Sequence, residues 1–311
     1  MAIAEHPKLS IVIVSYRCRD FLAACLGSLA ADVHAREGQV IVVDNNSCDG
    51  TVELVTERFP WVELVAVREN LGFAKANNVG IAKAVGRFVL LLNPDTIVTP
   101  DSLGAAVREL EGRPDVGMLG VKLLREDGRL DHACKRGFPT PLTSLYHFGG
   151  LSRRLPKGPK FAHYTAGSVG EDEVATIDAV NGAFMLVRRE ALDDVGPLDE
   201  DYWLYGEDLD WCFRFWAAGW KILYWPRVTV LHFKGGSSGK ARTWRTNLAF
   251  HRAMWLFYRK HCHANQQWLL AAAVWAGIFT RLLLTAGVSA GVRALSFLRC
   301  YSRTTGDAPS G

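Results

Sequence analysis

The sequence predicts an α/β fold with a mostly parallel central sheet, and three observations support this prediction. Over residues 9–92, short runs of branched apolar residues alternate with stretches of helical character, which is typical of βαβ units. The runs are continuously apolar, as expected for strands covered on both faces of a sheet. The strongest runs also end in polar residues, and ligands bind at that edge of open α/β sheets.

The elements are expected in the following order. Four strands are predicted at Leu9–Ser15, Gln39–Asp44, Val62–Val67 and Phe88–Leu92. The helices between them are predicted at Asp20–Ala31, Thr51–Phe59 and Gly72–Ala84. Residues 125–175 are rich in Gly, Pro and charge, which indicates loops. The remaining elements are an apolar stretch at Ile177–Arg188, a helix at Gly206–Gly219, two short strands around Pro226 within Lys221–His232, and a helix at Trp244–Lys260.

Length and composition favour one large domain with an appendage, because the chain has 311 residues of which 49% are apolar. The first residues lack the basic and apolar regions of a signal peptide. The seven cysteines form no Cys-x-x-Cys pair, which favours reduced thiols in the cytoplasm. We expect a domain over residues 1–240, a basic and apolar helical segment over 241–303, and a flexible tail over 304–311.

Charge is distributed unevenly along the chain. Residues 211–306 contain 14 Lys and Arg and no Asp or Glu, whereas residues 1–210 contain 22 basic and 31 acidic residues. A segment without acids indicates an anionic partner, which is a lipid headgroup, a phosphate or a nucleic acid. The long apolar stretches in this segment favour a membrane over a nucleic acid.

The apolar C-terminal segment is interrupted by a charge. Trp268–Thr280 is uncharged, but Arg281 follows, so the stretch falls short of the ~20 apolar residues that a membrane span needs. The main interpretation is an amphipathic helix or helical hairpin on the inner face of the membrane, with Trp268 and Trp275 at the interface. Packing of this face on the domain or on another subunit is the alternative.

Three polar clusters follow predicted strands, at Ser15-Tyr16, at "DNNS" from Asp44 and at "NPD" from Asn93. Asp44 can accept hydrogen bonds from a base or a ribose hydroxyl, although an Asx turn capping the next helix also explains it. Asp95 and neighbouring oxygens can hold a hard divalent cation that binds mainly through phosphate. Taken alone, a strand-ending turn is the simpler explanation of Asp95.

The stretch "RENLGFAKANNVG" combines a glycine with amides at the start of a predicted helix. Gly72 allows a ligand to approach the backbone closely. Asn77 is unfavourable inside a helix, which indicates that its amide has a hydrogen-bond partner. Lys75 can reach an anion.

The stretch "YWLYGEDLDWCFR" places Glu207, Asp208 and Asp210 at the start of an apolar helix, after several aromatic residues. Acids in a first turn interact favourably with the helix dipole, by about 0.3–1 kcal/mol each, but three acids exceed what one cap needs. A carboxylate among aromatic rings can be desolvated, and its proton affinity then rises toward that of a general base. His232 follows at a strand end, ahead of a Gly- and Ser-rich loop that can bind phosphate.

Together these stretches resemble the family 2 glycosyltransferases of the GT-A fold, especially the rhamnosyltransferase-like branch. The resemblance runs from about Leu9 to about Gly239. It is carried by "SIVIVSY", "VVDNNSCDGT", "NLGFAKANNVG", "LLLNPDT", "NGAFMLVRR", "YGEDLDWCFR" and the histidine of "LHFKGGSSG". It implies a GT-A domain and an inverting transferase that moves a sugar, with rhamnose from dTDP-rhamnose as the first hypothesis and a UDP-sugar as the second. The implied acceptor is a hydroxyl of a glycan or of a polyprenyl-phosphate-linked glycan in cell-envelope polysaccharide synthesis.

The resemblance also implies roles for the matching residues. The donor nucleotide and sugar would be held by Ser15, Tyr16, Asp44, Asn46, Asn70, Lys75, Asn77 and Asn93. Asp95 and His232 would hold Mg²⁺ or Mn²⁺, and Asn93 stands where many relatives carry Asp, which weakens the expected cation affinity. Asp208, paired with Glu207, would be the catalytic base. The acceptor pocket would be shaped by Asn181, Trp203 and Tyr205.

Two other functions are less consistent with the sequence. A nicotinamide-dependent enzyme would need a G-x-G-x-x-G motif after the first strand, where "SYRCRDF" stands instead. A non-catalytic sugar- or lipid-binding subunit on the same scaffold would not need the retained Asp44, Asp95, Asp208 and His232. Anionic lipids of the inner leaflet are the expected membrane partner, and no nucleic acid is expected.

Overall fold

The computed structural model describes residues 7–35, 38–139, 166–233, 243–262, 268 and 271–285. Contacts divide the chain into two units, Met1–Ala241 and Arg242–Gly311. The predicted boundaries at residues 240 and 303 remain predictions. The Gly- and Ser-rich loop after His232 and the tail over residues 304–311 lie outside the described residues.

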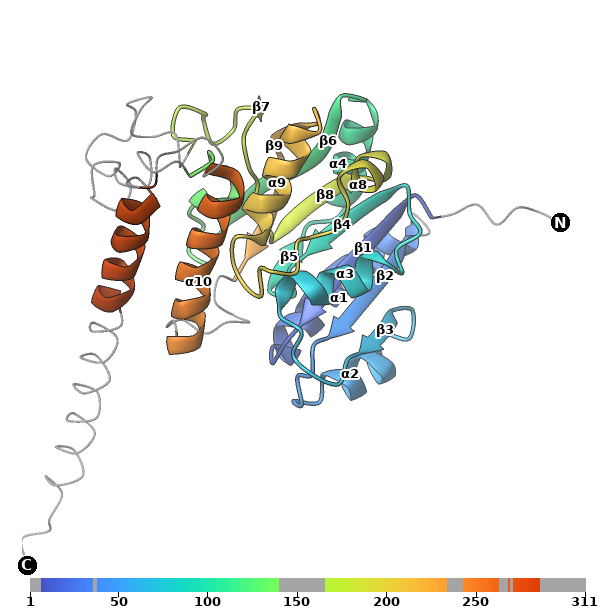
Figure 1. Cartoon of the computed structure of the whole chain (residues 1–311). Helices are drawn as coiled ribbons and strands as arrows, with labels where there is room; N and C mark the ends of the chain where they lie inside the picture. Colours follow the sequence, from blue (N-terminus) through green and yellow to red (C-terminus); the bar gives the residue numbers. More distant parts are fainter. Residues whose placement is uncertain are drawn as a thin grey trace, which may run out of the picture. The chain divides into compact units, whose positions relative to one another are not determined.

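The first half of the large unit is parallel, as the sequence predicts. Strands β1 (Leu9–Ser15), β2 (Gln39–Asp44), β3 (Glu63–Ala66) and β4 (Phe88–Leu92) lie in the order β3-β2-β1-β4. All three pairings are parallel, and every residue of β1 and β4 is buried. The connecting helices are α1 (Arg19–Ala35), α2 (Thr51–Arg58) and α3 (Phe73–Ile81). Figure 1 shows this sheet running through the unit with helices along its faces.

The second half of the sheet is mixed. Strand β8 (Phe184–Arg188) is antiparallel to both β4 and β6 (Val116–Leu124), and β6 is parallel to β9 (Lys221–His232). Two short strands, β5 (Thr96–Val98) and β7 (Ala175–Thr176), are antiparallel to β9. The α/β class with a central sheet is therefore confirmed, and parallel pairing is concentrated in its N-terminal half.

The sequence prediction of two short strands around Pro226 is wrong. Strand β9 is continuous over twelve residues, and its register against β6 shifts between Trp225 and Thr229. Proline has no N–H to donate to the neighbouring strand, and a bulge absorbs the missing hydrogen bond without ending the strand. The bulge lets one strand reach from Lys221 to His232, which lies at the same edge of the sheet as the carboxyl ends of β1, β2 and β4.

The remaining helices of the large unit are α4 (Ser102–Glu111), α8 (Arg189–Val195) and α9 (Glu207–Ala217), with a short 3₁₀ turn at His132–Cys134. Helix α9 begins where the sequence predicts. Gly206 precedes it with φ 83°, a left-handed conformation that glycine adopts at little cost. Trp211 and Phe215 are fully buried on the inner face of α9 and fix the helix to the core.

The second unit is helical in its described parts. Helix α10 (Trp244–Phe257) continues into a π-helical turn at Tyr258–Cys262, and residues 271–285 form a further helix. The Nδ2 of Asn247 donates to the Oγ1 of Thr285 over 3.0 Å, which ties the two helices together. Among the described helices, none has both the length and the hydropathy to cross a bilayer.

Candidate active site

The ends of β1 and β2 place two predicted residues side by side. Ser15 and Asp44 are register partners at the carboxyl ends of these parallel strands. The N–H of Asn45 then donates to the carbonyl of Ser15 over 2.8 Å, and the hydroxyl of Ser47 donates to the same carbonyl over 3.3 Å. The "DNNS" turn is therefore fastened to the first strand. Tyr16 follows directly and lies half-buried beneath the guanidinium of Arg17.

Two buried side-chain oxygens at this edge of the sheet accept no hydrogen bond from any described residue. Asp44 is buried and its Oδ2 accepts from the N–H of Ser47 over 3.3 Å, whereas its Oδ1 has no hydrogen-bond partner among the described residues. The side-chain Oδ1 of Asn93, just past β4, likewise has no hydrogen-bond partner among the described residues. Buried polar atoms are rarely left unsatisfied in folded proteins. Both oxygens are therefore suited to a ligand that carries N–H or O–H groups.

Several predicted ligand contacts are engaged in holding the fold. The Oδ1 of Asn70 accepts from Asn45 over 3.1 Å and from the N–H of Gly72 over 2.9 Å. The amide of Asn77 is buried and donates to the carbonyl of Phe73 one turn earlier. The predicted partner of Asn77 is thus its own helix. Sequence reasoning missed Asn45, which joins β2 to the loop before α3.

Two other residues that are predicted to contact the nucleotide-sugar donor lie at the surface of this region. Asn46 is half-buried with φ 62°, and its Oδ1 accepts a hydrogen bond from the exposed thiol of Cys48. Lys75 is exposed on α3. Contacts of these two side chains with the nucleotide-sugar donor remain predictions.

A histidine between two carboxylates forms the next part of the site. The Nε2 of His232 lies 3.5 Å from the Oδ1 of Asp95, and its Nδ1 lies 3.3 Å from the Oδ2 of Asp131. All three side chains are buried. Burial alone would lower the pKa of His232, but hydrogen bonds to Asp131 and Asp95 and the charges of these acids outweigh it and raise the pKa to about 9. The imidazole is therefore protonated at neutral pH.

Asp131 is absent from the sequence prediction, although it orients the predicted metal ligand. It lies in the stretch that the sequence assigns to loops, where its second role is to cap the 3₁₀ turn at His132–Cys134. A histidine ligand whose other ring nitrogen faces a carboxylate is common in metal sites. In the described part of the chain, no cluster of three or more His, Cys, Asp or Glu side chains is arranged to hold a metal ion.

The predicted base lies at the start of α9. One oxygen of Asp208, Oδ2, accepts from the Nη2 of Arg136 over 2.5 Å and from the N–H of Gly182 over 3.2 Å. The other oxygen lies 2.8 Å from the N–H of Leu209. Arg136 is a third residue that the sequence prediction missed, after Asn45 and Asp131, and no local pattern marks it.

The neighbouring acid, Glu207, has a different environment. It is buried, and its Oε2 has no hydrogen-bond partner among the residues that the structure describes. Burial and the charge of Asp208 raise the pKa of Glu207 to about 8. The desolvation that the sequence predicts for this stretch is therefore found at Glu207, which holds its proton at neutral pH.

A tight turn connects the Asn93 cluster to the base. The carbonyl of Ala183 accepts from the N–H of Asn93 over 3.0 Å, and its own N–H donates to the Oδ1 of Asn181 over 2.7 Å. The next residue back, Gly182, donates to Asp208. Thus residues 181–183 touch both the strand end that leads to Asp95 and the carboxylate of Asp208.

Two of the predicted acceptor residues, Trp203 and Tyr205, lie in the segment before α9. Trp203 is 42% exposed, and its carbonyl accepts from the N–H of Phe73 over 2.7 Å. Tyr205 is half-buried with φ 70°, directly before the glycine that starts α9. A side chain at Gly72 would collide with Trp203, because a Cβ built there lies 2.4 Å from its ring. Gly72 is thus required for close packing against Trp203.

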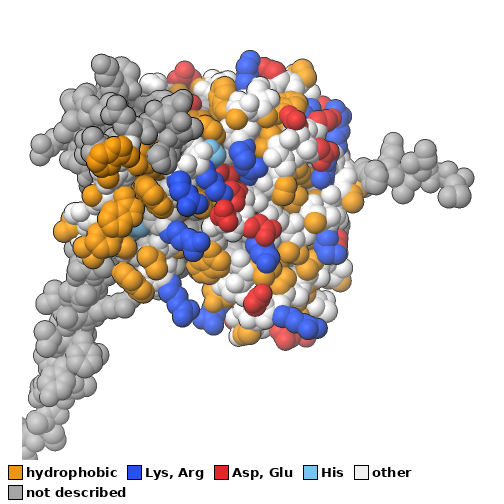
Figure 2. All heavy atoms as spheres, in the orientation of Figure 1, with side chains coloured by type: hydrophobic (Ala, Val, Ile, Leu, Met, Phe, Trp, Pro, Cys, Tyr) orange, Lys and Arg blue, Asp and Glu red, His pale blue; other side chains and the backbone are white. Residues whose placement is uncertain are grey.

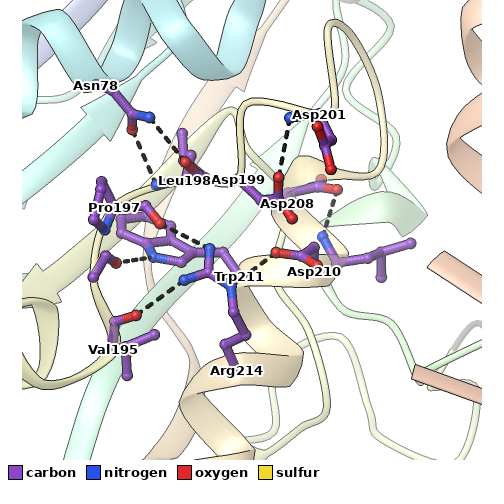
Figure 3. A network of polar contacts seen from close by, with 12 residues as sticks. Asn78, Val195, Pro197, Leu198, Asp199, Asp201, Asp208, Asp210, Trp211 and Arg214 are labelled. Atoms are coloured by element: carbon purple, nitrogen blue, oxygen red, sulfur yellow. Dashed lines mark hydrogen bonds and ion pairs between the residues drawn. The ribbon is translucent and has the colours of Figure 1, made fainter. Parts of the chain in front are cut away.

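The loop before these aromatic residues is held from two helices. Asn78 of α3 exchanges two hydrogen bonds with the backbone of Leu198, and Arg214 of α9 donates to the carbonyls of Val195 and Pro197. Trp211 adds a bond to the carbonyl of Gly196. Figure 3 shows these side chains converging on residues 195–198, with Asp208 and Asp210 nearby at the start of α9. The aromatic segment is therefore attached to a rigid support.

Comparison with known proteins shows the family of the chain. Residues 6–249 match the profile of the family described as glycosyltransferase like family 2. An N-acetylglucosaminyl-diphospho-decaprenol L-rhamnosyltransferase of Mycobacterium tuberculosis is 31% identical over 243 residues, which cover 75% of this chain and 78% of that protein. The rhamnosyltransferase WbbL of Escherichia coli is 27% identical over 72% of this chain and 82% of its own.

Solved structures share the fold at lower identity. The mannosyltransferase PcManGT of Pyrobaculum calidifontis, in complex with GDP-Man and Mn²⁺, aligns with a TM-score of 0.55 at 18% identity, over 97% of this chain and 84% of that one. Residues 1–349 of S. aureus TarS, in complex with UDP-GlcNAc, align with a TM-score of 0.56 at 18% identity, over 88% and 72%. Because the family profile spans most of the chain and the relatives align over about three quarters of it, the chain belongs to glycosyltransferase family 2 and is a transferase with a GT-A fold.

Proposed function

We propose that this glycosyltransferase moves rhamnose from dTDP-rhamnose to a hydroxyl of a polyprenyl-diphosphate-linked glycan, with inversion at the anomeric carbon. The relatives named above support this choice of donor and acceptor, since one of them is named for a diphospho-decaprenol substrate and both for rhamnosyl transfer. A UDP-sugar is the second candidate donor. The observation that carries the proposal is the 181–183 turn, which joins the strand end before Asp95 to Asp208.

The donor end of the site suits a nucleoside diphosphate. The free Oδ1 atoms of Asp44 and Asn93 provide two acceptors for the N–H of a base and the hydroxyls of a sugar. Ser15 and Asp44 lie together at the switch from β1 to its neighbours β2 and β4, the place where open α/β sheets bind nucleotides.

The residues present also fit a divalent cation. Asp95 would supply a buried carboxylate, and His232, once its Nε2 has released its proton, an imidazole that Asp131 orients. A cation with so few protein ligands binds largely through phosphate oxygens. Mg²⁺ or Mn²⁺ held there would offset the negative charge that develops on the departing diphosphate. Two fold neighbours support a divalent cation, since PcManGT and GalNAc-T7 were solved with Mn²⁺.

The chemical step then follows from the placement of Asp208. Its carboxylate takes the proton from the acceptor hydroxyl while the hydroxyl oxygen forms a bond to the anomeric carbon. The bond from that carbon to the diphosphate breaks, and the nucleoside diphosphate leaves with the electron pair. Attack on the face opposite the leaving group gives inversion. In this proposal, Asn181, Trp203 and Tyr205 shape the acceptor pocket.

The proposal is tested with the purified full chain and a synthetic polyprenyl-diphosphate-GlcNAc acceptor. We expect transfer from dTDP-rhamnose, detected by mass spectrometry of the lipid, and a faster rate than with UDP-glucose, UDP-galactose or UDP-GlcNAc. Transfer from a UDP-sugar but not from dTDP-rhamnose would mean that the donor is a UDP-sugar. Absence of both transfer and donor hydrolysis, with either divalent cation present, would favour the non-catalytic subunit instead.

We further propose that the helical unit binds the cytoplasmic face of the membrane as a peripheral protein. In the helix at 271–285, Trp275, Phe279 and Leu283 follow one another at intervals of four and are exposed by 51%, 44% and 56%. Figure 2 shows hydrophobic side chains gathered on the surface of this unit. Since residues 211–306 contain no acid, an anionic lipid surface is the matching partner.

Vesicle flotation tests this second proposal. The full chain should float with phosphatidylglycerol-containing vesicles more than with pure phosphatidylcholine, and salt should weaken the binding. The double variant Trp275→Ser/Phe279→Ser should lose binding, while Val85→Ser, which removes an exposed apolar side chain from the large unit, should not. If the parent protein dimerises through this face and does not bind vesicles, the alternative that the face packs on another subunit is supported.

A further inference from the structure

The start of α9 contains more buried acid than base. Glu207, Asp208 and Asp210 are exposed by only 6%, 9% and 1%. Asp210 pairs with Arg214 over 2.9 Å, and Asp208 pairs with Arg136 over 2.5 Å. Glu207 has no ion pair among the described residues and has a free Oε2. Among the described residues, two arginines thus form ion pairs with two of the three carboxylates, and the third carboxylate, that of Glu207, is next to the predicted base.

Arg136 is held in place by hydrogen bonds to the backbone of Ala179 and Val180, in addition to its ion pair with Asp208. The backbone of Arg136 exchanges two hydrogen bonds of 2.9 Å with Ala179, and its Nη2 also donates to the carbonyl of Val180 over 2.6 Å. The same segment continues to Gly182, whose N–H donates to the oxygen of Asp208 that Arg136 binds. Both donors therefore hold Oδ2 from one support, and they set the orientation of the whole carboxylate.

We propose that Arg136 is a positioning residue that acts through Asp208. It fixes the carboxylate in the orientation needed for proton transfer and decides which of the two adjacent acids carries the negative charge. This inference rests on the proposed role of Asp208 as the base.

Two buried carboxylates in adjacent positions disfavour double ionisation, and the charge stays on the one with a cation beside it. Among the described residues, the charged and titratable groups that interact with Asp208 are Glu207 and Cys212 on its own helix and Arg136 from outside it. Asp210, on the same helix, is next to this group and interacts with Arg214 and Tyr202. Because an arginine stays protonated at any working pH, it stabilises the charge on Asp208 throughout that range. Without Arg136, one proton would be shared between Glu207 and Asp208.

The test compares Arg136→Met and Arg136→Lys with Arg214→Met. Arg214 is the matched control, because it also pairs with an acid of α9 and donates to backbone carbonyls but does not contact Asp208. Initial rates of transfer are measured from about pH 6 to about pH 9, together with donor binding by calorimetry. We expect Arg136→Met to lower kcat about 10²-fold near neutral pH, with donor affinity within a few-fold of the parent. The loss should shrink as pH rises, and Arg136→Lys should recover part of the rate.

Arg214→Met should change the pH profile little, even where it lowers the melting temperature. The double variant Arg136→Met/Asp208→Asn should be no slower than Asp208→Asn alone, because the arginine acts only through that carboxylate. An equal loss at every pH, or losses that multiply in the double variant, would overturn the inference. Should Arg136→Met not fold, Arg136→Lys provides the same pH comparison. An Asp208→Asn enzyme with nearly full activity would instead refute the proposed base.

Discussion

The two ends of the site both bury carboxylates, but they neutralise them with different cations. At the end that we propose for the diphosphate (the diphosphate end), one imidazole, His232, lies between Asp95 and Asp131. At the end that we propose for the base (the base end), the guanidinium of Arg136 binds Asp208, while Glu207 forms no ion pair with a described residue and its Oε2 accepts no hydrogen bond from one. An imidazolium can give up its proton, and its nitrogen can then bind a metal, whereas a guanidinium keeps its charge. The first end is thus suited to exchanging its positive charge, and the second to keeping it fixed.

The largest expected effect separates the two ends by function. Asp208→Asn should lower kcat by about 10²–10⁴-fold, because the amide cannot take the proton of the acceptor. Donor affinity should stay close to that of the parent, since Asp208 belongs to the base end. Asp95→Asn should weaken donor binding itself, because the carboxylate at the diphosphate end is lost. Calorimetry with dTDP-rhamnose and initial rates measure both quantities.

The two variants are expected to differ in the quantity that changes, which is kcat for Asp208→Asn and donor affinity for Asp95→Asn. Turnover of Asp208→Asn within a few-fold of the parent would remove the base from this position. Equal losses of donor affinity in Asp208→Asn and Asp95→Asn would mean that the two ends do not act separately.

A smaller effect is expected for a change at Asp131, which contacts His232 at the diphosphate end. Asp131→Asn keeps the hydrogen-bond acceptor that caps the 3₁₀ turn but removes the negative charge beside the Nδ1 of His232. Changes to such supporting residues typically cost 10–100-fold in metal affinity, so Mn²⁺ affinity should fall by about that factor. Calorimetric titration of Mn²⁺ into the dTDP-loaded protein measures this directly. Nucleotide affinity in EDTA should be unchanged, and a loss there would show general damage to the site instead.

The sequence alone predicted the parts of the site that follow strongly apolar strands. Asp44 and Asn93 stand where uninterrupted runs end, and the structure places both at the same edge of the sheet with free oxygens. Asn70 and Asn77 look the same in sequence, but their amides are occupied by the fold. An amide in a sequence pattern does not reveal which partner it meets.

The residues that the sequence missed act over long separations. Arg136 meets an acid 72 residues later, and Asp131 meets a histidine 101 residues later. Both lie in a stretch without periodicity, which predicts loops and gives no register from which to infer contacts. Their partners are decided by the packing of β6, β8 and β9, and that packing depends on a mixed sheet and on a bulge that local patterns do not predict.

The smallest expected effect tests whether Glu207 is the acid left without a cation. Its pKa is about 8 in the folded chain, against an ordinary value of 4.5, so the folded state keeps a proton that the unfolded state releases. The stability from this group is complete below about pH 4.5 and is lost as pH rises toward 8. His232 acts with the same sign, because its pKa rises from 6.5 to about 9.

Glu207→Gln therefore separates the two contributions. Glutamine resembles the protonated acid in shape and cannot ionise, so the melting temperature of the variant should fall less than that of the parent between about pH 5 and pH 8. A decline toward pH 9 should remain, since His232 still loses its proton there. Thermal unfolding followed by circular dichroism over this range measures both slopes. Identical slopes in the parent and in Glu207→Gln would mean that Glu207 is already ionised at neutral pH, and that the base end holds a second cation for it.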